Sequence, residues 1–161
     1  MPSYSAMTSA QFSYSKLTNV NTYAFRLALR FWHPSVDAES ISSAIGREAD
    51  VSARAGDQRA TPLGQPLKGT HPTNYWQKGI VQIEDSSELG AETAIANLLA
   101  ELLPVADFLV GMRAGGGKGV LEIDSWADHP YAIQLTPEIL REASRMGLEI
   151  SHHVFKTRQY Y

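Results

Sequence analysis

Arginine and aromatic side chains gather on one side of the first regular stretch of the chain. Between residues 21 and 32 every second residue is apolar, and the residues between them include Arg26, Arg30 and Trp32. A period of two is typical of a β-strand, whose successive side chains point to opposite faces. Arginine and tryptophan dominate many protein–protein contacts, so these three are candidate binding residues. The alternative is a solvated face on which arginine stems lie over Trp32.

Further candidate binding residues lie in and after the long connection of residues 47–74, which holds three prolines and several turn-forming residues. A connection of this length in a compact domain is either functional or folded on itself. A short strand around residues 50–54 is compatible with its sequence. Arg59 supplies a cation for an acidic partner, and Tyr75 and Trp76 follow the connection. We expect any binding site between this loop and the Arg/Trp face, unless Tyr75 and Trp76 only anchor the loop in the core.

Motifs that could carry catalysis fail on spacing or direction. The glycine-rich residues 115–119 lack P-loop spacing and follow a predicted helix, whose C-terminal dipole repels anions. His152 and His153 are neighbours on a predicted strand and point to opposite faces, and the five histidines form no HExxH pattern. The stretch from Asp124 to His129 is more typical of a turn than of an acid–base pair. We expect no catalytic residue, no metal site and no cofactor.

Composition narrows the classes of partner. The 161 residues are 43% hydrophobic and 19% charged, which is typical of a globular protein. The absence of cysteine excludes disulfides and thiol catalysis. A formal charge of −3 disfavours nucleic acid, and we find no apolar run typical of a membrane span. Another protein or further copies of the chain remain as partners. Residues 1–21 lack signal-peptide features, so we expect a tail outside the core and a cytoplasmic protein.

The predicted elements form one α+β domain over residues 22–161. We expect an antiparallel-rich sheet with helices mainly on one face, and a ferredoxin-like βαββαβ succession followed by an extra strand, helix and strand. The helix signals are caps at Asp37 and Thr136, and a serine at 86 or 87 before a leucine-rich stretch. The predicted strands span residues 21–32, 75–83, 119–124, 131–135 and 148–155.

The loop sequence and its frame resemble a known family. The pieces are Ala55-Gly56-Asp57-Gln58-Arg59, Thr61-Pro62-Leu63-Gly64, Leu67-Lys68-Gly69 and Tyr75-Trp76. Together with the surrounding strands and helices, from about Tyr23 to Phe155, they resemble the bacterial domain-of-unknown-function family numbered 4279. That family has no established activity to transfer. The resemblance implies a bacterial protein, and the occurrence of family members near toxin systems implies an immunity-type or regulatory binding role.

Two functions therefore stand against each other. The first is a non-enzymatic interaction module that uses the Arg/Trp face. The second is a small enzyme or ligand-binding protein with a pocket under residues 47–74, lined by Arg59, Tyr75, Trp76 and a histidine. The missing catalytic signatures favour the first, and we lean away from an enzyme.

Overall fold

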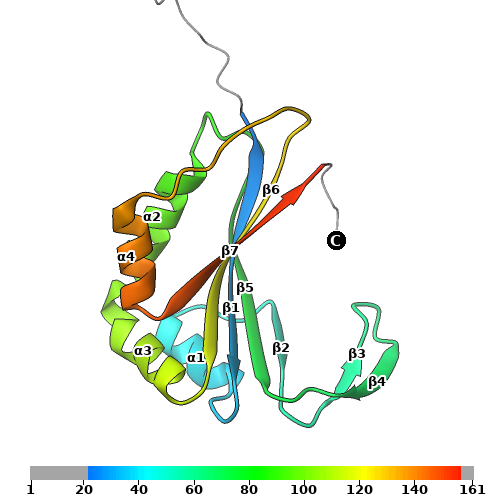
Figure 1. Ribbon diagram of the computed structural model, residues 1–161. Helices are drawn as coiled ribbons and strands as arrows, with labels where there is room; N and C mark the ends of the chain where they lie inside the picture. Colours follow the sequence, from blue (N-terminus) through cyan, green and yellow to red (C-terminus); the bar gives the residue numbers. More distant parts are fainter. Residues whose placement is uncertain (1–21, 157–161) are drawn as a thin grey trace, which may run out of the picture.

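A five-stranded sheet runs through the molecule, and the helices pack against one of its faces (Figure 1). The computed structural model describes residues 22–156, so the predicted tail of residues 1–21 lies outside them. The elements in chain order are β1 (Ala24–His33), α1 (Ala38–Ile45), β2 (Val51–Ala53), β3 (Gln58–Ala60), β4 (Pro66–Thr70), β5 (Asn74–Ile83), α2 (Ala91–Leu102), the 3₁₀ turn η1 (Leu103–Val105), α3 (Ala106–Ala114), β6 (Lys118–Trp126), α4 (Pro137–Arg145) and β7 (Leu148–Phe155).

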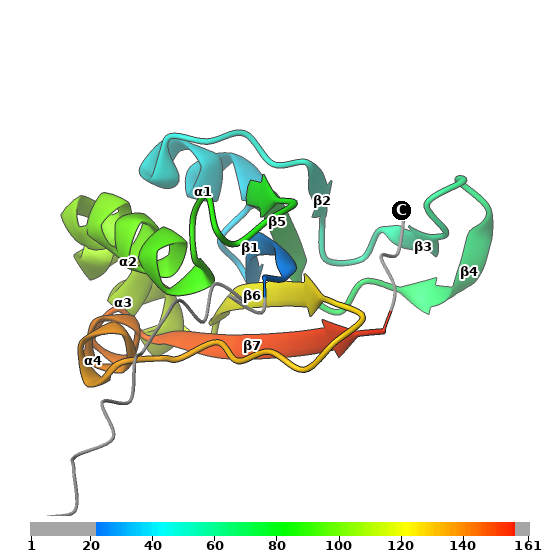
Figure 2. The same ribbon diagram turned by 90° about the horizontal axis from the view of Figure 1, so that it is seen from above.

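The strand order in the main sheet is β2-β5-β1-β6-β7. The neighbours among β2, β5, β1 and β6 pair antiparallel. β7 runs parallel to β6, because α4 carries the chain back along the helix side of the sheet. The order β2-β5-β1-β6 is the one that two interlocked β-α-β units produce. The predicted α+β class is confirmed, with the helices on one side. A second, two-stranded sheet of β3 and β4 projects beyond the other face (Figure 2).

The alternation in β1 sets the core. The predicted apolar face is buried between sheet and helices, with exposed fractions of 0–7% for Tyr23, Phe25, Leu27, Leu29 and Phe31. The apolar stripe of α2 packs against it through Ile95, Leu98, Leu99 and Leu102. The period of two therefore assigned the two faces of the central strand correctly.

Two predicted helix caps are confirmed. The Asp37 carboxylate accepts a hydrogen bond from the Ser40 amide at 2.8 Å, and α1 begins at the next residue. The Thr136 hydroxyl accepts from the Ile139 amide at 3.4 Å, and Pro137 occupies the first helical position of α4. Both side chains satisfy amides that lack partners at a helix start.

The leucine-rich helix begins later than predicted. It starts at Ala91 after Gly90, and not at Ser86 or Ser87. The reason is that Ser86 holds the start of β1: its hydroxyl accepts from the Tyr23 amide at 3.1 Å, and its amide donates to the Tyr23 carbonyl. Ser86 is therefore used for a strand contact and not for a helix cap.

The predicted strand at residues 131–135 is wrong. This segment has no regular secondary structure and joins no ladder. The Tyr131 hydroxyl lies 2.6 Å from Ser125 Oγ, and the Gln134 amide donates to Glu92 Oε1 at 2.8 Å. The neighbour of β6 at that side of the sheet is β7.

A helical stretch of 24 residues, Ala91–Ala114, has the length and composition of a membrane span, with a mean hydropathy of 1.6 over its most apolar window. This differs from the expectation that no such run exists. Pro104 breaks the stretch at η1, and six residues of α2 are buried in the core. Core helices of globular proteins meet the same criterion, so the expected lack of membrane contact stays a prediction.

Candidate functional site

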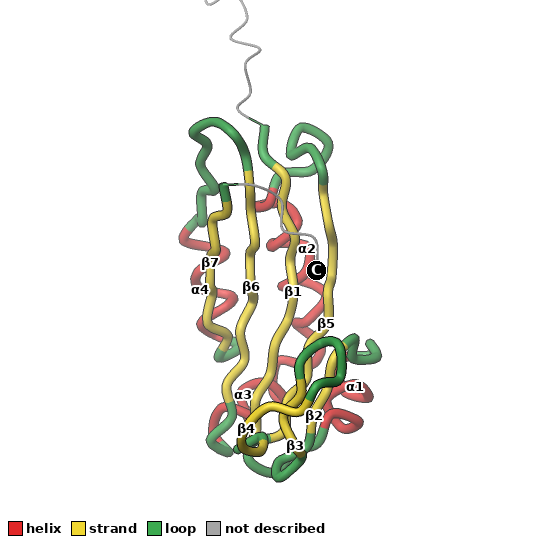
Figure 3. The backbone as a smooth tube through the Cα atoms, turned by 90° about the vertical axis from the view of Figure 1, so that its right-hand side faces the viewer, coloured by secondary structure: helices red, strands yellow, loops and turns green. Residues whose placement is uncertain are grey.

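The face of the main sheet that no helix covers is the candidate functional surface, and we call it the open face (Figure 3). Strand register places on it Arg26, Arg30 and Trp32 of β1, Tyr75 and Gln77 of β5, Glu122 and Asp124 of β6, and Ser151 and His153 of β7. The three residues that the sequence placed together on β1 thus share a face. The pairing of strands distant in sequence adds the rest.

Two ion pairs fix the arginines of the open face. Arg30 lies 2.8 Å from Glu122, and Arg26 pairs with Asp124. The carboxylate side chains are only 4% and 6% exposed, whereas those of the two arginines are 29% and 33% exposed. The buried acids therefore hold the guanidinium groups in place while part of each arginine faces solvent.

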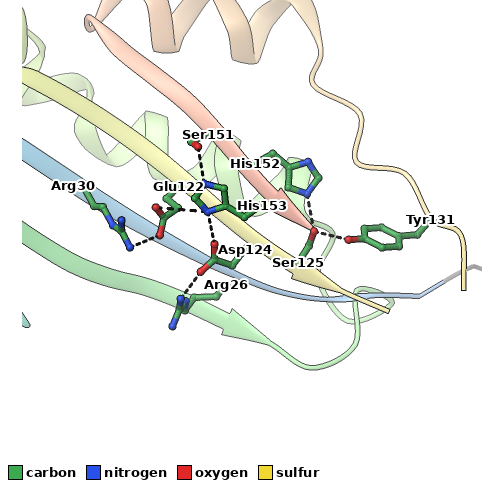
Figure 4. A network of polar contacts seen from close by, with 9 residues as sticks. All are labelled: Arg26, Arg30, Glu122, Asp124, Ser125, Tyr131, Ser151, His152 and His153. Atoms are coloured by element: carbon green, nitrogen blue, oxygen red, sulfur yellow. Dashed lines mark hydrogen bonds and ion pairs between the residues drawn. The ribbon is translucent and has the colours of Figure 1, made fainter. Parts of the chain in front are cut away.

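His153 joins the two ion pairs into one network (Figure 4). Its Nδ1 lies 3.0 Å from Asp124 and 3.9 Å from Glu122, and its Nε2 lies 3.1 Å from Ser151 Oγ. The sequence missed this cluster because it depends on β6 and β7 being neighbours. A sequence signal for the cluster does exist. Glu122 and Asp124 are two residues apart on one strand, as are Ser151 and His153 on another, so each pair shares a face of its strand.

Burial also shifts the pKa values of three side chains in and next to the open face. Burial of Glu122, reinforced by the nearby Asp124 carboxylate, raises the pKa of Glu122 although Arg30 opposes the shift. Burial raises the pKa of the Tyr75 hydroxyl too. On the helix side of β7, burial and the neighbouring His153 lower the pKa of His152.

Carboxylate, imidazole and hydroxyl in the order Asp124–His153–Ser151 have the connectivity of a nucleophile relay. Two features oppose that chemistry here. Asp124 is already bound to Arg26. Ser151 lies on the same strand as its histidine, two residues away. The geometry is that of a structural network.

The same residues could also hold a metal ion. Ligand atoms of Glu122, Asp124 and His153 lie within 4.8 Å of one another. Both carboxylates, however, already bind a guanidinium, whose positive charge repels a cation. A divalent ion would have to displace both arginines, so the arrangement favours the ion pairs, and the expected absence of a metal site stays a prediction.

An aromatic pair extends the open face toward β2. The rings of Trp32 and Tyr75 lie 5.3 Å apart, and the Tyr75 hydroxyl lies 2.5 Å from Gln77 Oε1. Trp76 points to the opposite side and is 0% exposed. Its ring packs 5.5 Å from that of Phe31, and its indole nitrogen donates to Ser42 at 3.0 Å. Of the predicted pair after the loop, only Tyr75 reaches the open face.

The connection of residues 47–74 is folded on itself. β2 adds to the edge of the main sheet, and residues 58–70 form a hairpin of β3 and β4, which we call the arm. Every residue of β3 and β4 is exposed. Arg59 lies on β3, and within residues 22–156 neither its side chain nor that of Lys68 forms a hydrogen bond or ion pair. Leu63, near the turn, is 89% exposed.

The foot of the arm is well tied. The Asn74 side chain accepts from the Ala55 amide at 2.9 Å and donates to the Val36 carbonyl at 2.9 Å. Backbone hydrogen bonds join His71 to Gly56 and Asp57. The arm therefore projects from a fixed base, although the hairpin has no core of its own.

A polar cavity of about 370 Å³ lies beside the first part of the connection, in the region where the alternative hypothesis placed a pocket. Its charged lining consists of Glu39, Glu48, Arg54 and Asp57. Arg59, Tyr75 and Trp76 do not line it. No histidine lines it either, so the cavity lacks the residues that the alternative hypothesis placed there.

Comparisons with protein-family models, with curated proteins and with solved structures found no match to this chain.

Proposed function

We propose that this chain is a non-enzymatic protein-binding module whose arm and open face contact an acidic partner protein. The observation that carries the proposal is the arm: a hairpin of fully exposed strands, tied at its foot, with Leu63 89% exposed. A two-stranded hairpin without a hydrophobic face is marginally stable by itself. Exposed apolar side chains that form a patch mark a binding surface, and the arm offers Leu63 together with Leu67, which is 40% exposed.

The positive charge of the arm favours an acidic partner surface. Residues 58–70 contain Arg59 and Lys68 but no acidic residue. A partner surface with carboxylates around an apolar depression would complement both features. The cations of the open face are already paired with carboxylates, which leaves little free charge for a phosphate backbone. This disfavours nucleic acid as the ligand.

The open face supplies a second contact region beside the arm. Its Trp32–Tyr75 pair offers a rigid aromatic surface, and the partly exposed side chains of Arg26 and Arg30 are held in fixed positions. Fixed side chains lose little conformational entropy on binding. In this proposal the chain is a cytoplasmic bacterial protein of the family it resembles, with an immunity-type or regulatory role.

Binding tests on arm variants decide the proposal. Full-length protein immobilised on a support should retain one cellular protein in stoichiometric amount, and the purified pair should then bind directly in calorimetry. Arg59→Glu and Leu63→Ser should each weaken that binding by about ten-fold or more, as removal of an interface anchor does. Arg141→Glu, a charge reversal at an exposed residue of α4, is the matched control and should bind as the parent does. Equal affinity of all variants would refute the proposal.

The alternative function as an enzyme has one observation in its favour, the Asp124–His153–Ser151 connectivity. A fluorophosphonate probe, which labels activated serines, tests it directly. We expect no labelling of the native protein. Labelling that disappears in Ser151→Ala would establish a hydrolase in place of a binding module.

A further inference from the structure

The outer edge of β7 is open to another strand. β7 is the last strand of the sheet and pairs only with β6 among the described strands. Within residues 22–156 no backbone hydrogen bond outside that ladder involves Leu148–Phe155. Unpaired edges are usually protected by lysine, proline or a bulge. The eight residues of β7 include neither lysine nor proline, and their register with β6 is continuous. Their one carboxylate, Glu149, is paired with Lys118 of the neighbouring strand.

An apolar groove follows this edge on the helix side. A cavity of about 780 Å³ lies between β7, α3 and α4, and its apolar lining includes Val110, Leu140, Leu148 and Ile150. Val110 and Leu140 are 45% and 48% exposed, and Val154, near the end of the strand, is 64% exposed. Three of the exposed large aliphatic side chains of the described residues therefore line or flank one strand edge.

We propose that a second copy of this chain pairs along this edge, with the two β7 strands antiparallel about a twofold axis at Ser151. Directly opposite residues of an antiparallel pair point to the same face of the sheet. A residue of the open face must therefore lie opposite another residue of the open face, which allows an axis at any one residue of β7. With Ser151 opposite Ser151, the Glu149 carboxylate of each copy faces the His153 imidazole of the other. Val154 then faces Leu148, at the groove.

Charge complementarity favours this register over its neighbours. An axis at Ile150 would place Glu149 opposite Ser151, and an axis at His152 would place it opposite Phe155. Only the axis at Ser151 sets a carboxylate against an imidazole twice, and opposite cross-strand pairs of this kind stabilise a sheet. The exposed Val110 and Leu140 add apolar surface that an eight-residue strand pair lacks by itself.

The resulting dimer would have one continuous sheet, with the helices of both copies on one side and the two open faces on the other. The arms project from the open face, on the side away from the helices, and leave the β7 edge uncovered (Figures 2 and 3). The dimer thus goes beyond the proposed function and concerns a separate surface. It presents two arms and two open faces to a partner.

Single cysteines test the register because the chain has none of its own. Sedimentation equilibrium of the full chain should give twice the mass of one chain. Under mild oxidation Ser151→Cys should form a disulfide-linked dimer, since the two Cα atoms lie opposite each other within the reach of a disulfide. Glu149→Cys alone should link about ten-fold less, because the two copies of residue 149 are about 13 Å apart. Mixed Glu149→Cys and His153→Cys proteins should link to each other.

Two results would overturn the dimer: a chain that sediments as a monomer, or a dimer in which Glu149→Cys links to itself as readily as Ser151→Cys. Thermal unfolding of each cysteine variant shows that the fold is retained. The arm variants Arg59→Glu and Leu63→Ser should keep the dimer mass, so failure of the dimer and failure of the proposed function are read separately.

Discussion

The arginines of the open face owe their positions to two short acids beneath them. A free arginine side chain samples many rotamers, but Arg26 and Arg30 are each held by a carboxylate that is almost fully buried. Each Nε is buried without a hydrogen-bond partner in the described part of the chain, which shows how closely the stems pack on the sheet. This arrangement buries two carboxylates, which costs free energy of hydration. In Glu122 that cost appears as a raised pKa.

The stability of the protein should depend on pH through Glu122. Burial raises the pKa of Glu122 above its usual value of 4.5, so between the two values the folded state binds more protons than the unfolded state. Stability from this group is therefore complete below pH 4.5 and is lost as pH rises through the raised pKa. Relative to Glu122→Gln, the native protein should be most stable in acid and lose that advantage toward neutral pH. Urea midpoints at a series of pH values measure it.

Glu149, on the same face, supplies a control of opposite sign. Its pKa is lowered by the Lys118 ion pair, at 2.9 Å. The advantage of the native protein over Glu149→Gln should appear above pH 4.5 and vanish as pH falls through the lowered pKa. Identical pH profiles for the two variants would contradict the assignment of Glu122 as the desolvated group.

At the scale of elements, the glycine run after α3 is explained by packing and not by phosphate binding. Gly116 has φ of +87°, and Gly117 lies against the end of β1. A Cβ at Gly117 would come within 2.5 Å of the His33 ring and 2.8 Å of the Met112 carbonyl oxygen. The run lets α3 turn directly into β6 beside β1.

Gly117→Ala should therefore destabilise the protein by about 1–3 kcal/mol, as overpacking against a rigid neighbour does. Gly111 is the matched control: it lies within α3, and a Cβ there would meet nothing within 4 Å. Gly111→Ala should instead stabilise by about 0.5–1 kcal/mol, because alanine favours helix. Chemical denaturation of both variants measures the two effects, and equal midpoints would refute the packing argument.

Elements with a strong period or cap were predictable from sequence, and those defined by long-range pairing were not. The alternation of β1 and the Thr136-Pro137 start of α4 are local signals, and both were confirmed. The sequence predicts residues 47–74 as a long connection that is functional or folded on itself, but not the hairpin, because a hairpin exposed on both faces carries no hydrophobic period. Similarly, Arg26, Arg30 and Trp32 could be placed on one face, whereas their neighbours Glu122, Asp124 and His153 depend on strand order.

The whole molecule divides into a packed body and an arm that contributes almost nothing to its core. None of residues 58–70 belongs to the buried cluster. The foot of the arm is closed independently, since His71 and Asp57 are joined by a backbone hydrogen bond. Binding and stability should therefore be separable in this protein.

Replacement of residues 58–70 by Gly-Gly should leave the body folded. Asp57 and His71 already lie at hydrogen-bond distance, and a two-residue turn can join such neighbours. We expect a urea midpoint close to that of the native protein, together with loss of partner binding. Trp76→Ala, just beyond the foot and in the core, should by contrast cost about 3–5 kcal/mol. If the variant without the arm no longer unfolds cooperatively, the arm supports the body and the prediction is wrong.

The first strand of the described residues, β1, is the central strand of the main sheet, and this has a consequence for biosynthesis. β1 has β5 on one side and β6 on the other, and its start pairs with Trp126, about a hundred residues later. At about 5–20 residues per second, a ribosome needs about 5–20 s to deliver that partner. During this interval Phe25, Leu27, Leu29 and Phe31 have no completed sheet to cover them. Because so many contacts are distant in sequence, we expect slow folding after release, and a nascent chain that depends on chaperones until β6 emerges.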